Sequence, residues 1–141
     1  MTDAFIDTNV LLYAASDVAS ELSKKQQAQD LLNGVRFGIS VQVLQEFYVN
    51  AVGKLAPSIP ESNLDAVLAM LRRRPIAAIT PALFDVAVEL KHRYQISYWD
   101  AAIIAAAKEL GAKTIYSEDL AHGQSYDGIQ VVNPFIAAAA S

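Results

Sequence analysis

Short apolar runs alternate along this chain with longer stretches in which apolar residues recur every three or four positions. Runs of three or four residues predict strands, and the longer periodic stretches predict helices. The predicted strands cover residues 4–6, 37–39, 76–79, 113–116 and 130–132. The predicted helices cover residues 8–15, 21–32, 40–54, 61–73, 81–94 and 97–110. Strands this short, separated by helices, favour an α/β fold with a parallel sheet covered on both faces.

Local signals mark several predicted helix ends. Ser40 and Thr80 have the side chains of helix caps, and Pro81 follows Thr80 at the first helical position. Gly111 is placed to end the helix 97–110. The helix 40–54 carries a predicted apolar stripe of Leu44, Phe47, Tyr48, Ala51, Val52 and Leu55. These signals support the pattern of alternating strands and helices.

Composition narrows the class of protein. The 141 residues fit one domain, predicted to span 1–136, and the alanine-rich segment 137–141 is expected to fray. An apolar content of 53% supports a core, and the lack of cysteine excludes disulfides and thiol chemistry. The net charge of −4 counts against a nonspecific nucleic-acid binder. Without a basic leader or an apolar run of about 18 residues, the expectation is a cytoplasmic protein with no membrane contact.

Four carboxylates lie at the ends of predicted strands or within predicted helices. Asp7 and Asp119 follow predicted strands, Asp100 lies in the first turn of an apolar helix, and Glu46 lies within the helix 40–54. In open parallel sheets the ligand cleft lies beyond the carboxyl ends of the strands. If the fold gathers these four side chains, they would hold a divalent cation against a phosphate.

Each of these acids also has a structural explanation. Asp7 could simply cap the helix that follows it. Asp100 matches a capping box with Ser97, although the apolar segment after it predicts a buried helix, where an unpaired charge is costly. Glu46 lies opposite the predicted apolar stripe, so its default interpretation is a solvent-facing side chain.

The acid after the strand 113–116 is ambiguous, because Glu118 and Asp119 are adjacent and either could be an ordinary loop residue. We favour Asp119, since the spacing Ser117-x-Asp119 allows the serine hydroxyl to orient the aspartate carboxylate or a water bound to it. Individually, none of the four acids specifies a function.

Four segments together resemble the PIN domain, and specifically the VapC-type toxins of toxin–antitoxin pairs. They are Phe5-Ile6-Asp7-Thr8-Asn9-Val10-Leu11, the segment Ser40 to Phe47, Tyr98-Trp99-Asp100-Ala101-Ala102, and Tyr116-Ser117-Glu118-Asp119-Leu120 with the later Val132-Asn133-Pro134-Phe135. They occur in the family's order and span nearly the whole chain. The resemblance implies a three-layer α/β/α sandwich with a short central parallel sheet.

The resemblance also implies a ribonuclease that uses Mg²⁺ or Mn²⁺ and leaves a 5′-phosphate. As a hypothesis, Asp7 and Asp100 are the principal metal ligands, and Glu46 and Asp119 bind a second ion or act through water. The side chains expected to orient this catalytic set are Asn9, Ser117 and, more weakly, Thr8. An RNA substrate, a cognate antitoxin and a homodimer are the implied partners.

Two other functions remain open at this point. The first is a non-catalytic PIN-type module that binds RNA or protein. The second is a Mg²⁺-dependent hydrolase of small phosphate esters, although the chain lacks a glycine-rich phosphate loop. The RNA target cannot be inferred from these residues.

Several other residues have candidate roles with simpler explanations. Arg72-Arg73-Arg74 could contact RNA phosphates, but cations at the end of a helix are expected from its dipole. Tyr98 and Trp99 could stack on bases, but we expect them in the core. His92 and His122 have no ligand spacing and are assigned no role.

Overall fold

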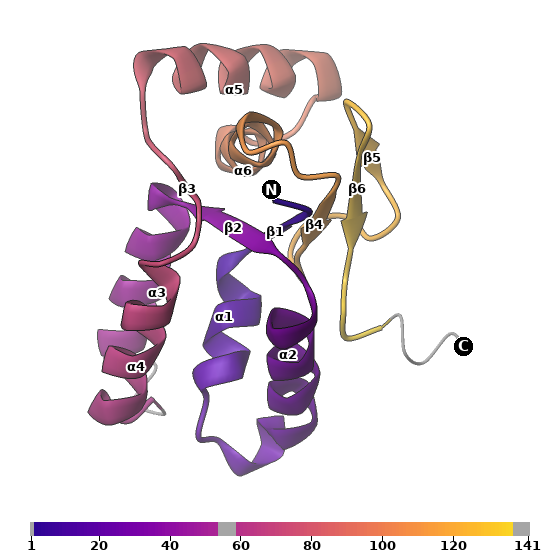
Figure 1. Cartoon of the computed structure of the whole chain (residues 1–141). Coiled ribbons are helices and arrows are strands. Elements are labelled where there is room, and N and C mark those ends of the chain that lie inside the picture. Colours follow the sequence, from indigo (N-terminus) through magenta and orange to yellow (C-terminus); the bar gives the residue numbers. More distant parts are fainter. Residues whose placement is uncertain (1, 54–58, 137–141) are drawn as a thin grey trace.

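A central sheet of short strands organises residues 2–53 and 59–136, the part of the chain that the computed structural model describes (Figure 1). The strands are β1 (Ala4–Ile6), β2 (Phe37–Ser40), β3 (Ile76–Ala77), β4 (Thr114–Tyr116), β5 (Ser125–Tyr126) and β6 (Ile129–Val132). Their order across the sheet is β3-β2-β1-β4-β6-β5. All neighbours pair in parallel except β5 and β6, which are antiparallel.

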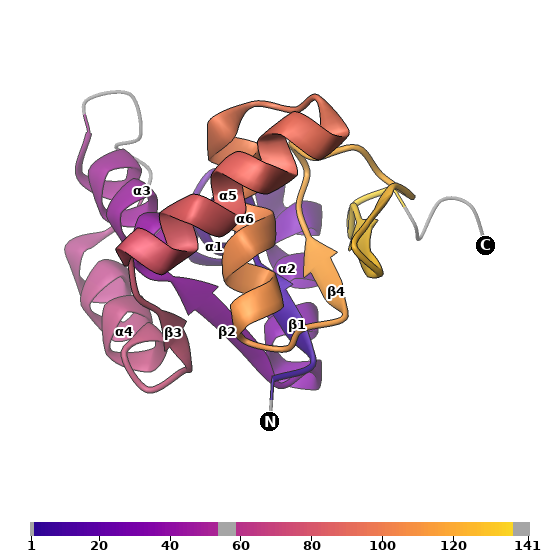
Figure 2. The same ribbon diagram turned by 90° about the horizontal axis from the view of Figure 1, so that it is seen from above.

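Helices cover both faces of this sheet. They are α1 (Thr8–Ala15), α2 (Leu22–Gly34), α3 (Val41–Val52), α4 (Glu61–Leu71), α5 (Pro81–Tyr94) and α6 (Tyr98–Glu109), with a short 3₁₀ helix, η1 (Ala19–Glu21). The first four lie on one face, and α6 lies on the other with α5 outside it (Figure 1). Seen from above, α5 crosses α6, which lies over the strands (Figure 2). The predicted α/β class with helices on both faces is confirmed.

The strand order places a switch point between β1 and β4. From β1 the chain steps outward through β2 to β3, with its connecting helices on one face of the sheet. It then returns past β1 to β4 through α5 and α6 on the opposite face, as right-handed crossovers require. Ligand clefts in open α/β sheets form beyond the carboxyl ends of strands at such a point. The residues that follow β1 and β4 are therefore the first place to look for a site.

Side chains cap the helices where the sequence predicted caps. Ser40, Thr80 and Ser97 each accept a backbone hydrogen bond from the third residue of their helix, at 3.2, 3.1 and 3.1 Å. Gly111 has φ +75° just after α6, a conformation that favours glycine. These predicted helix ends are confirmed to within about two residues.

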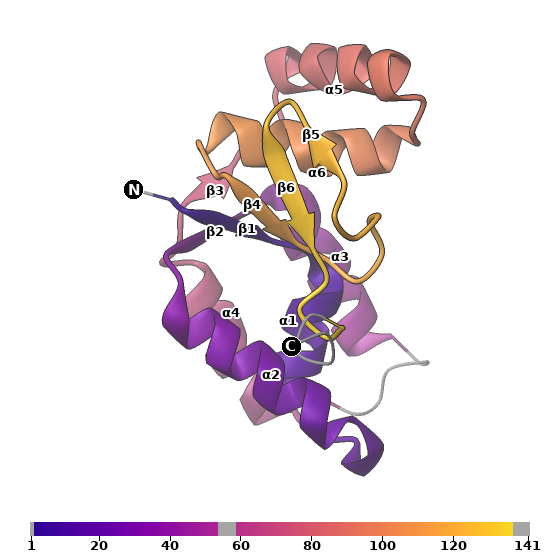
Figure 3. The same ribbon diagram turned by 90° about the vertical axis from the view of Figure 1, so that its right-hand side faces the viewer.

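The sheet departs from the prediction at its edges. β3 ends at Ala77 rather than at residue 79, and β5 was not predicted because a two-residue strand has no periodic signal. β5 and β6 form a hairpin at one edge (Figure 3). Asp127 and Gly128 form the turn of this hairpin, with φ +54° and +84°. The sheet is thus mostly, not wholly, parallel.

The buried face of α3 is rotated from the predicted stripe. Val43, Phe47 and Ala51 are buried, whereas Tyr48 and Val52 are 50% and 54% exposed. The buried residues are four positions apart and begin at Val43, one position before Leu44. One position along a helix corresponds to a rotation of about 100°, so the buried face is turned away from Tyr48 and Val52. The prediction was wrong for Tyr48 and Val52. Leu55, the end of the predicted helix at residue 54 and the predicted fraying of 137–141 lie outside the described residues.

Helix α6 is buried on every side along most of its length. Ala101 to Ala107 are all buried, because the sheet contacts one side of the helix and α5 the other. Its first turn is different: Tyr98 is half-buried and Trp99 is 66% exposed, so the prediction of a core position was wrong for Trp99. None of the helices in the described ranges is both long and apolar enough to span a membrane.

Candidate functional site

Asp7 lies between the end of β1 at Ile6 and the start of α1 at Thr8. Only 8% of its surface is exposed. Its Oδ1 accepts a 2.8 Å hydrogen bond from the backbone N–H of Thr8 at the start of the helix. The predicted capping role is confirmed, but it uses one carboxylate oxygen and leaves the second for another partner.

Ser117 supplies that partner from the other side of the switch point. This serine follows β4 and is fully buried. Its hydroxyl donates to Asp7 Oδ2 at 2.7 Å and accepts from the backbone N–H groups of Asp119 and Leu120 at 3.1 Å. Ser117 was expected to orient the Asp119 carboxylate. It instead orients the carboxylate of Asp7 and shapes the backbone that carries Asp119.

Glu46 reaches the site from α3. It is exposed, as its position on the helix indicated. Thr8 Oγ1 donates to Glu46 Oε1 at 3.2 Å and so holds this carboxylate beside the start of α1. Thr8, the weakest of the three predicted orienting residues, therefore has a direct contact with a predicted catalytic acid.

Asn9 links α1 to the segment after β4. Its Oδ1 accepts a 3.1 Å hydrogen bond from the backbone N–H of Glu118. Its Nδ2 is buried and has no hydrogen-bond partner within the described part of the chain. A buried donor left unpaired is costly, so this amide is available to a water or a bound oxygen.

Glu118 and Asp119 differ in their surroundings. The Glu118 carboxylate accepts from Lys24 Nζ at 2.6 Å and from the Tyr13 hydroxyl at 3.1 Å. The Asp119 side chain is exposed and has no hydrogen bond or ion pair recorded among the described residues. Since Glu118 is already neutralised, this difference favours Asp119 as the fourth acid, which stays a prediction.

Asp100 lies in the first turn of α6, on the face of the sheet opposite to α1 and α3. Its backbone N–H is capped by Ser97, and its side chain is half-buried rather than enclosed. Its charge acts on Tyr126, whose pKa is raised by burial and further by Asp100. The predicted burial of the helix that follows Asp100 is confirmed, and it begins at Ala101.

Three of the predicted acids share an electrostatic environment. Burial raises the pKa of Asp7, the hydrogen bonds from Ser117 and Thr8 oppose this, and the charges of Asp119 and Glu46 raise it further. The three carboxylates thus create a negative potential at the switch point. Within 2–53 and 59–136, however, no three His, Asp or Glu side chains are close enough to enclose a metal ion.

The residues present nevertheless fit Mg²⁺ or Mn²⁺. Both ions favour oxygen ligands, and Mg²⁺ commonly binds through one or two carboxylates while keeping several waters and contacting a substrate phosphate. A cation would offset both the burial of the Asp7 charge and the repulsion from Asp119 and Glu46, which together raise the Asp7 pKa. The unpaired Asn9 Nδ2 lies on the helix turn that begins at Asp7 and could donate to a water or phosphate oxygen.

The arginine run lies elsewhere. Arg72-Arg73-Arg74 precedes β3 and is therefore at the amino edge of the sheet, opposite the site. Arg74 packs over the ring of Phe37 at 4.3 Å. His122 Nδ1 accepts from the backbone N–H of Asn133 at 2.9 Å, a structural contact.

Sequence reasoning missed a group around Lys24. Its ammonium contacts Glu118, 94 positions away in the chain, and Tyr13. It also lies over the ring of Phe135 at 5.3 Å. No local pattern could have connected these residues, because each comes from a different element.

Comparison with known proteins places this geometry in context. The family model of the PIN domain matches residues 4–124. No protein with a curated description matches the chain. Three similar solved structures are a toxin–antitoxin complex from Klebsiella pneumoniae, VapC20 from Mycobacterium tuberculosis, described as a sarcin–ricin loop cleaving toxin, and DNA-bound VapBC from Salmonella typhimurium.

These three structures share the fold at low sequence identity. The Klebsiella chain is 22% identical with a TM-score of 0.67, over 94% of this chain and 98% of that one. VapC20 is 18% identical with a TM-score of 0.64, over 83% and 90%. The Salmonella chain is 20% identical with a TM-score of 0.66, over 93% and 97%. Because the family model matches most of the chain, residues 4–124, the chain belongs to the PIN domain family.

Proposed function

We propose that this protein is a Mg²⁺- or Mn²⁺-dependent endoribonuclease, the toxin of a cytoplasmic toxin–antitoxin pair. The observation that carries the proposal is the buried Asp7 carboxylate, which the Ser117 hydroxyl holds in place. Its pKa is raised by burial and by the charges of Asp119 and Glu46. Such an arrangement is unfavourable for folding alone, and a cation relieves it. Membership of the PIN family and the likeness to VapBC structures support the same function.

Each predicted site residue has a role in this proposal. Asp7 and Asp100 are the principal ligands, and Glu46 and Asp119 bind a second ion or act through water. A bound cation supplies a more acidic water and offsets the charge of a phosphodiester. Ser117 fixes Asp7, Thr8 fixes Glu46 and Asn9 fixes the backbone at Glu118. Cleavage leaves a 5′-phosphate.

The lack of a preformed three-carboxylate group among the described residues bears on this mechanism. Because no three acids enclose an ion in the described residues, the substrate phosphate is proposed to complete the coordination. Metal binding should then be weak without RNA and tighter with it. This coupling distinguishes the site from a preformed protein cage.

The proposed partners are an antitoxin and a second copy of the chain. The structures from Klebsiella and Salmonella are toxin–antitoxin complexes by their descriptions. Exposed apolar side chains on α3 and near the start of α6 offer surface for association, namely Tyr48, Val49, Val52, Phe84 and Trp99. An antitoxin that covers the acidic edge would block the site.

A second candidate function is a non-catalytic PIN-type binding module. The lack of a three-carboxylate metal cage within the described residues favours it. In that case Asp7 caps α1 and Ser117 stabilises the switch point without any chemistry. The two functions make opposite predictions for purified protein.

The deciding experiment is cleavage of a total RNA pool by antitoxin-free protein with Mg²⁺ or Mn²⁺. We expect discrete fragments that disappear with EDTA and fall at least about a hundredfold in Asp7→Asn and Asp100→Asn. Asp65→Asn, which removes an exposed acid on α4, should cleave normally. Mapping the fragment ends would give the RNA target.

Two results would reject the proposal. Folded protein that leaves RNA intact with either metal would support the binding module. Hydrolysis of a small chromogenic phosphate, with RNA left uncut, would support a phosphate-ester hydrolase. Activity retained by Asp100→Asn would remove that residue from the mechanism.

A further inference from the structure

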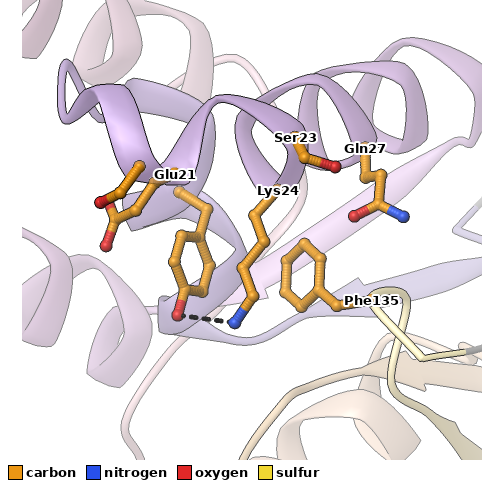
Figure 4. Close-up of a pocket in the computed structure, with 7 residues that line it drawn as sticks. Glu21, Ser23, Lys24, Gln27 and Phe135 are labelled. Carbon is orange, nitrogen blue, oxygen red and sulfur yellow. Dashed lines mark hydrogen bonds between the residues drawn. The ribbon is translucent and has the colours of Figure 1, made fainter.

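An open pocket of about 670 Å³ lies beside the acidic edge, between α1, the start of α2 and the segment after β6 (Figure 4). Its lining residues are Tyr13, Ser20, Glu21, Ser23, Lys24, Gln27 and Phe135. Lys24 ties the pocket to the site, because its ammonium contacts Glu118, the neighbour of Asp119. Tyr13 is six residues beyond Asp7, or about 9 Å along the helix axis. The pocket is therefore close enough to serve the same bound molecule.

The Lys24 ammonium is held in position with one donor to spare. It donates to Glu118 Oε2 at 2.6 Å and to the Tyr13 hydroxyl at 3.1 Å. An ammonium has three donors, and the described residues provide partners for these two. Lys24 remains 39% exposed, so the third N–H can reach a ligand in the pocket.

Aromatic and neutral polar groups make up the rest of the wall. The rings of Tyr13 and Phe135 meet edge to face at 5.0 Å, and Lys24 lies over them at 4.6 and 5.3 Å. Figure 4 places Lys24 between Glu21 on one side and Phe135 on the other. Gln27, on the same side as Phe135, carries both a donor and an acceptor, as the edge of a base requires.

We propose that this pocket binds a nucleotide of the RNA strand next to the cleaved phosphodiester. Lys24 contacts a backbone phosphate, Phe135 and Tyr13 provide a surface on which a base stacks, and Gln27 bonds to the base edge. A cation combined with aromatic rings is the usual means of holding single-stranded RNA. The proposal rests on the proposed ribonuclease function and adds a substrate-binding subsite to it.

The position of Lys24 favours this pocket over other surfaces. Lys24 is paired with Glu118, as Arg36 is with Asp3 and as Arg93 and Lys108 are with Asp127, so its location and not its pairing distinguishes it. Arg72-Arg73-Arg74 lies at the opposite edge of the sheet. Lys24 is the cation that contacts the segment carrying Asp119 in the described structure.

The acids of the pocket set the direction in which a nucleotide would lie. Glu21 accepts a 2.6 Å hydrogen bond from Ser16 and makes its end of the pocket unfavourable for phosphate. Glu118 shares the Lys24 ammonium, so a bound phosphate competes with it. The phosphate is therefore expected at Lys24, away from Glu21, with the base directed towards Phe135 and Gln27.

The test is binding of a fluorescent single-stranded RNA of mixed sequence and about ten nucleotides. All variants are made in full-length Asp7→Asn protein with Mg²⁺, so that the probe is not cut. Lys24→Gln should weaken binding roughly fivefold and reduce the salt slope by about 0.7. Phe135→Leu, which keeps apolar bulk but removes the ring, should weaken binding roughly tenfold with little change in salt slope.

Two controls separate substrate contact from structural support. Lys25→Gln makes the same charge change one residue away, outside the pocket lining, and should bind nearly as the parent does. Glu118→Gln releases the ammonium from its acid and should bind RNA as tightly as the parent or more tightly. A purely structural ion pair predicts instead that Lys24→Gln and Glu118→Gln weaken binding alike.

The outcomes distinguish this proposal from the proposed function. The subsite would be overturned if the Lys24→Gln and Lys25→Gln variants bound RNA equally well. It would also be overturned if Lys24→Gln and Glu118→Gln weakened RNA binding to the same extent. Cleavage of the RNA pool by protein with Asp7 intact, with an unchanged KM in Lys24→Gln, would overturn the subsite and leave the nuclease. Binding that depends on Lys24 and Phe135 without any cleavage would support the subsite and reject the nuclease.

Discussion

Asp7 stabilises the local structure through hydrogen bonds, although its negative charge is unfavourable in the folded protein. Its carboxylate caps α1 and accepts the Ser117 hydroxyl across the switch point. Burial and two neighbouring acids nevertheless raise its pKa, so its ionised form is disfavoured in the folded protein. Groups that break the rules of stable folding in this way are concentrated at functional sites. The net effect of the Asp7 charge on the free energy of unfolding can be measured without any knowledge of the substrate.

Replacing Asp7 by Asn should stabilise the metal-free protein at neutral pH. The change removes a disfavoured charge and keeps an acceptor for the Thr8 N–H, so we expect about 1 kcal/mol in unfolding free energy and roughly 3 °C in Tm. Thermal unfolding in EDTA would measure it. Because the folded pKa of Asp7 is raised, wild-type stability from this group is full below the unfolded value of 3.8 and is lost as pH rises through the folded pKa. The advantage of the variant should therefore vanish at acid pH.

Two further observations would complete that test. Adding Mg²⁺ should stabilise the wild type more than Asp7→Asn, since the cation removes the same cost. A variant less stable than the wild type at pH 7 in EDTA would show that the hydrogen bond from Ser117 outweighs the burial of charge.

At the scale of single residues, the sequence indicated candidate acids but not their contacts. Asp7, Glu46 and Asp119 could be proposed because each follows or lies in a segment with a clear pattern. The partner of Ser117 could not, since pairing of β1 with β4 brings Asp7 rather than Asp119 to its hydroxyl. Contacts between distant elements depend on strand order, which local spacing does not contain.

Helix α6 has the longest unbroken run of buried residues among the described helices, from Ala101 to Ala107. It is apolar around its whole circumference because it lies between the sheet and α5. A row of alanines allows both neighbours to approach closely, and protein interiors are packed too densely to admit larger side chains without displacement. The second strand is adapted in the same way, since a Cβ at Gly38 would lie 2.7 Å from the side chain of Leu110.

Enlarging Ala106 tests this description of α6. Ala106→Leu should lower the unfolding free energy by about 1–3 kcal/mol, because the added atoms have no space at a fully buried position. Urea unfolding would measure the change. Ala69→Leu makes the same substitution on the exposed side of α4 and should stay within about 0.5 kcal/mol. Equal effects at the two positions would contradict the tight packing of α6.

Elements were predictable where periodicity was long and uncertain where it was short. The helix beginning near Ser97 could be placed within about a residue, because its cap, length and closing glycine agree. The two-residue β5 has too few positions to show alternation. The exposed Trp99 could not be anticipated, since an apolar helix gives no sign of where its cover ends.

At the scale of the whole molecule, several large apolar side chains are exposed to solvent. Tyr48, Val49 and Val52 are at least half exposed on α3, and Trp99 and Phe84 are exposed near the start of α6 and on α5. Scattered apolar side chains are normal on a surface, but contiguous ones favour association. This distribution supports the homodimer proposed above.

Light scattering of purified, antitoxin-free protein at micromolar concentration would measure the oligomeric state. We expect a dimer. A monomer would count against it and would leave the exposed side chains to another partner. A Tyr48→Glu and Val52→Lys double variant should weaken the dimer if α3 contributes to it, whereas Asp65→Asn should not.

The hydrogen bond from Ser117 to Asp7 joins positions 110 residues apart in the chain. During synthesis, β1 emerges from the ribosome early, but β4, beside which it pairs, comes only after α6 has been made. Until then Asp7 has no Ser117 to orient it, and Asp119 does not yet exist. An unfinished chain therefore carries no assembled acidic edge, so any activity that depends on this edge would begin only after β4 has been made.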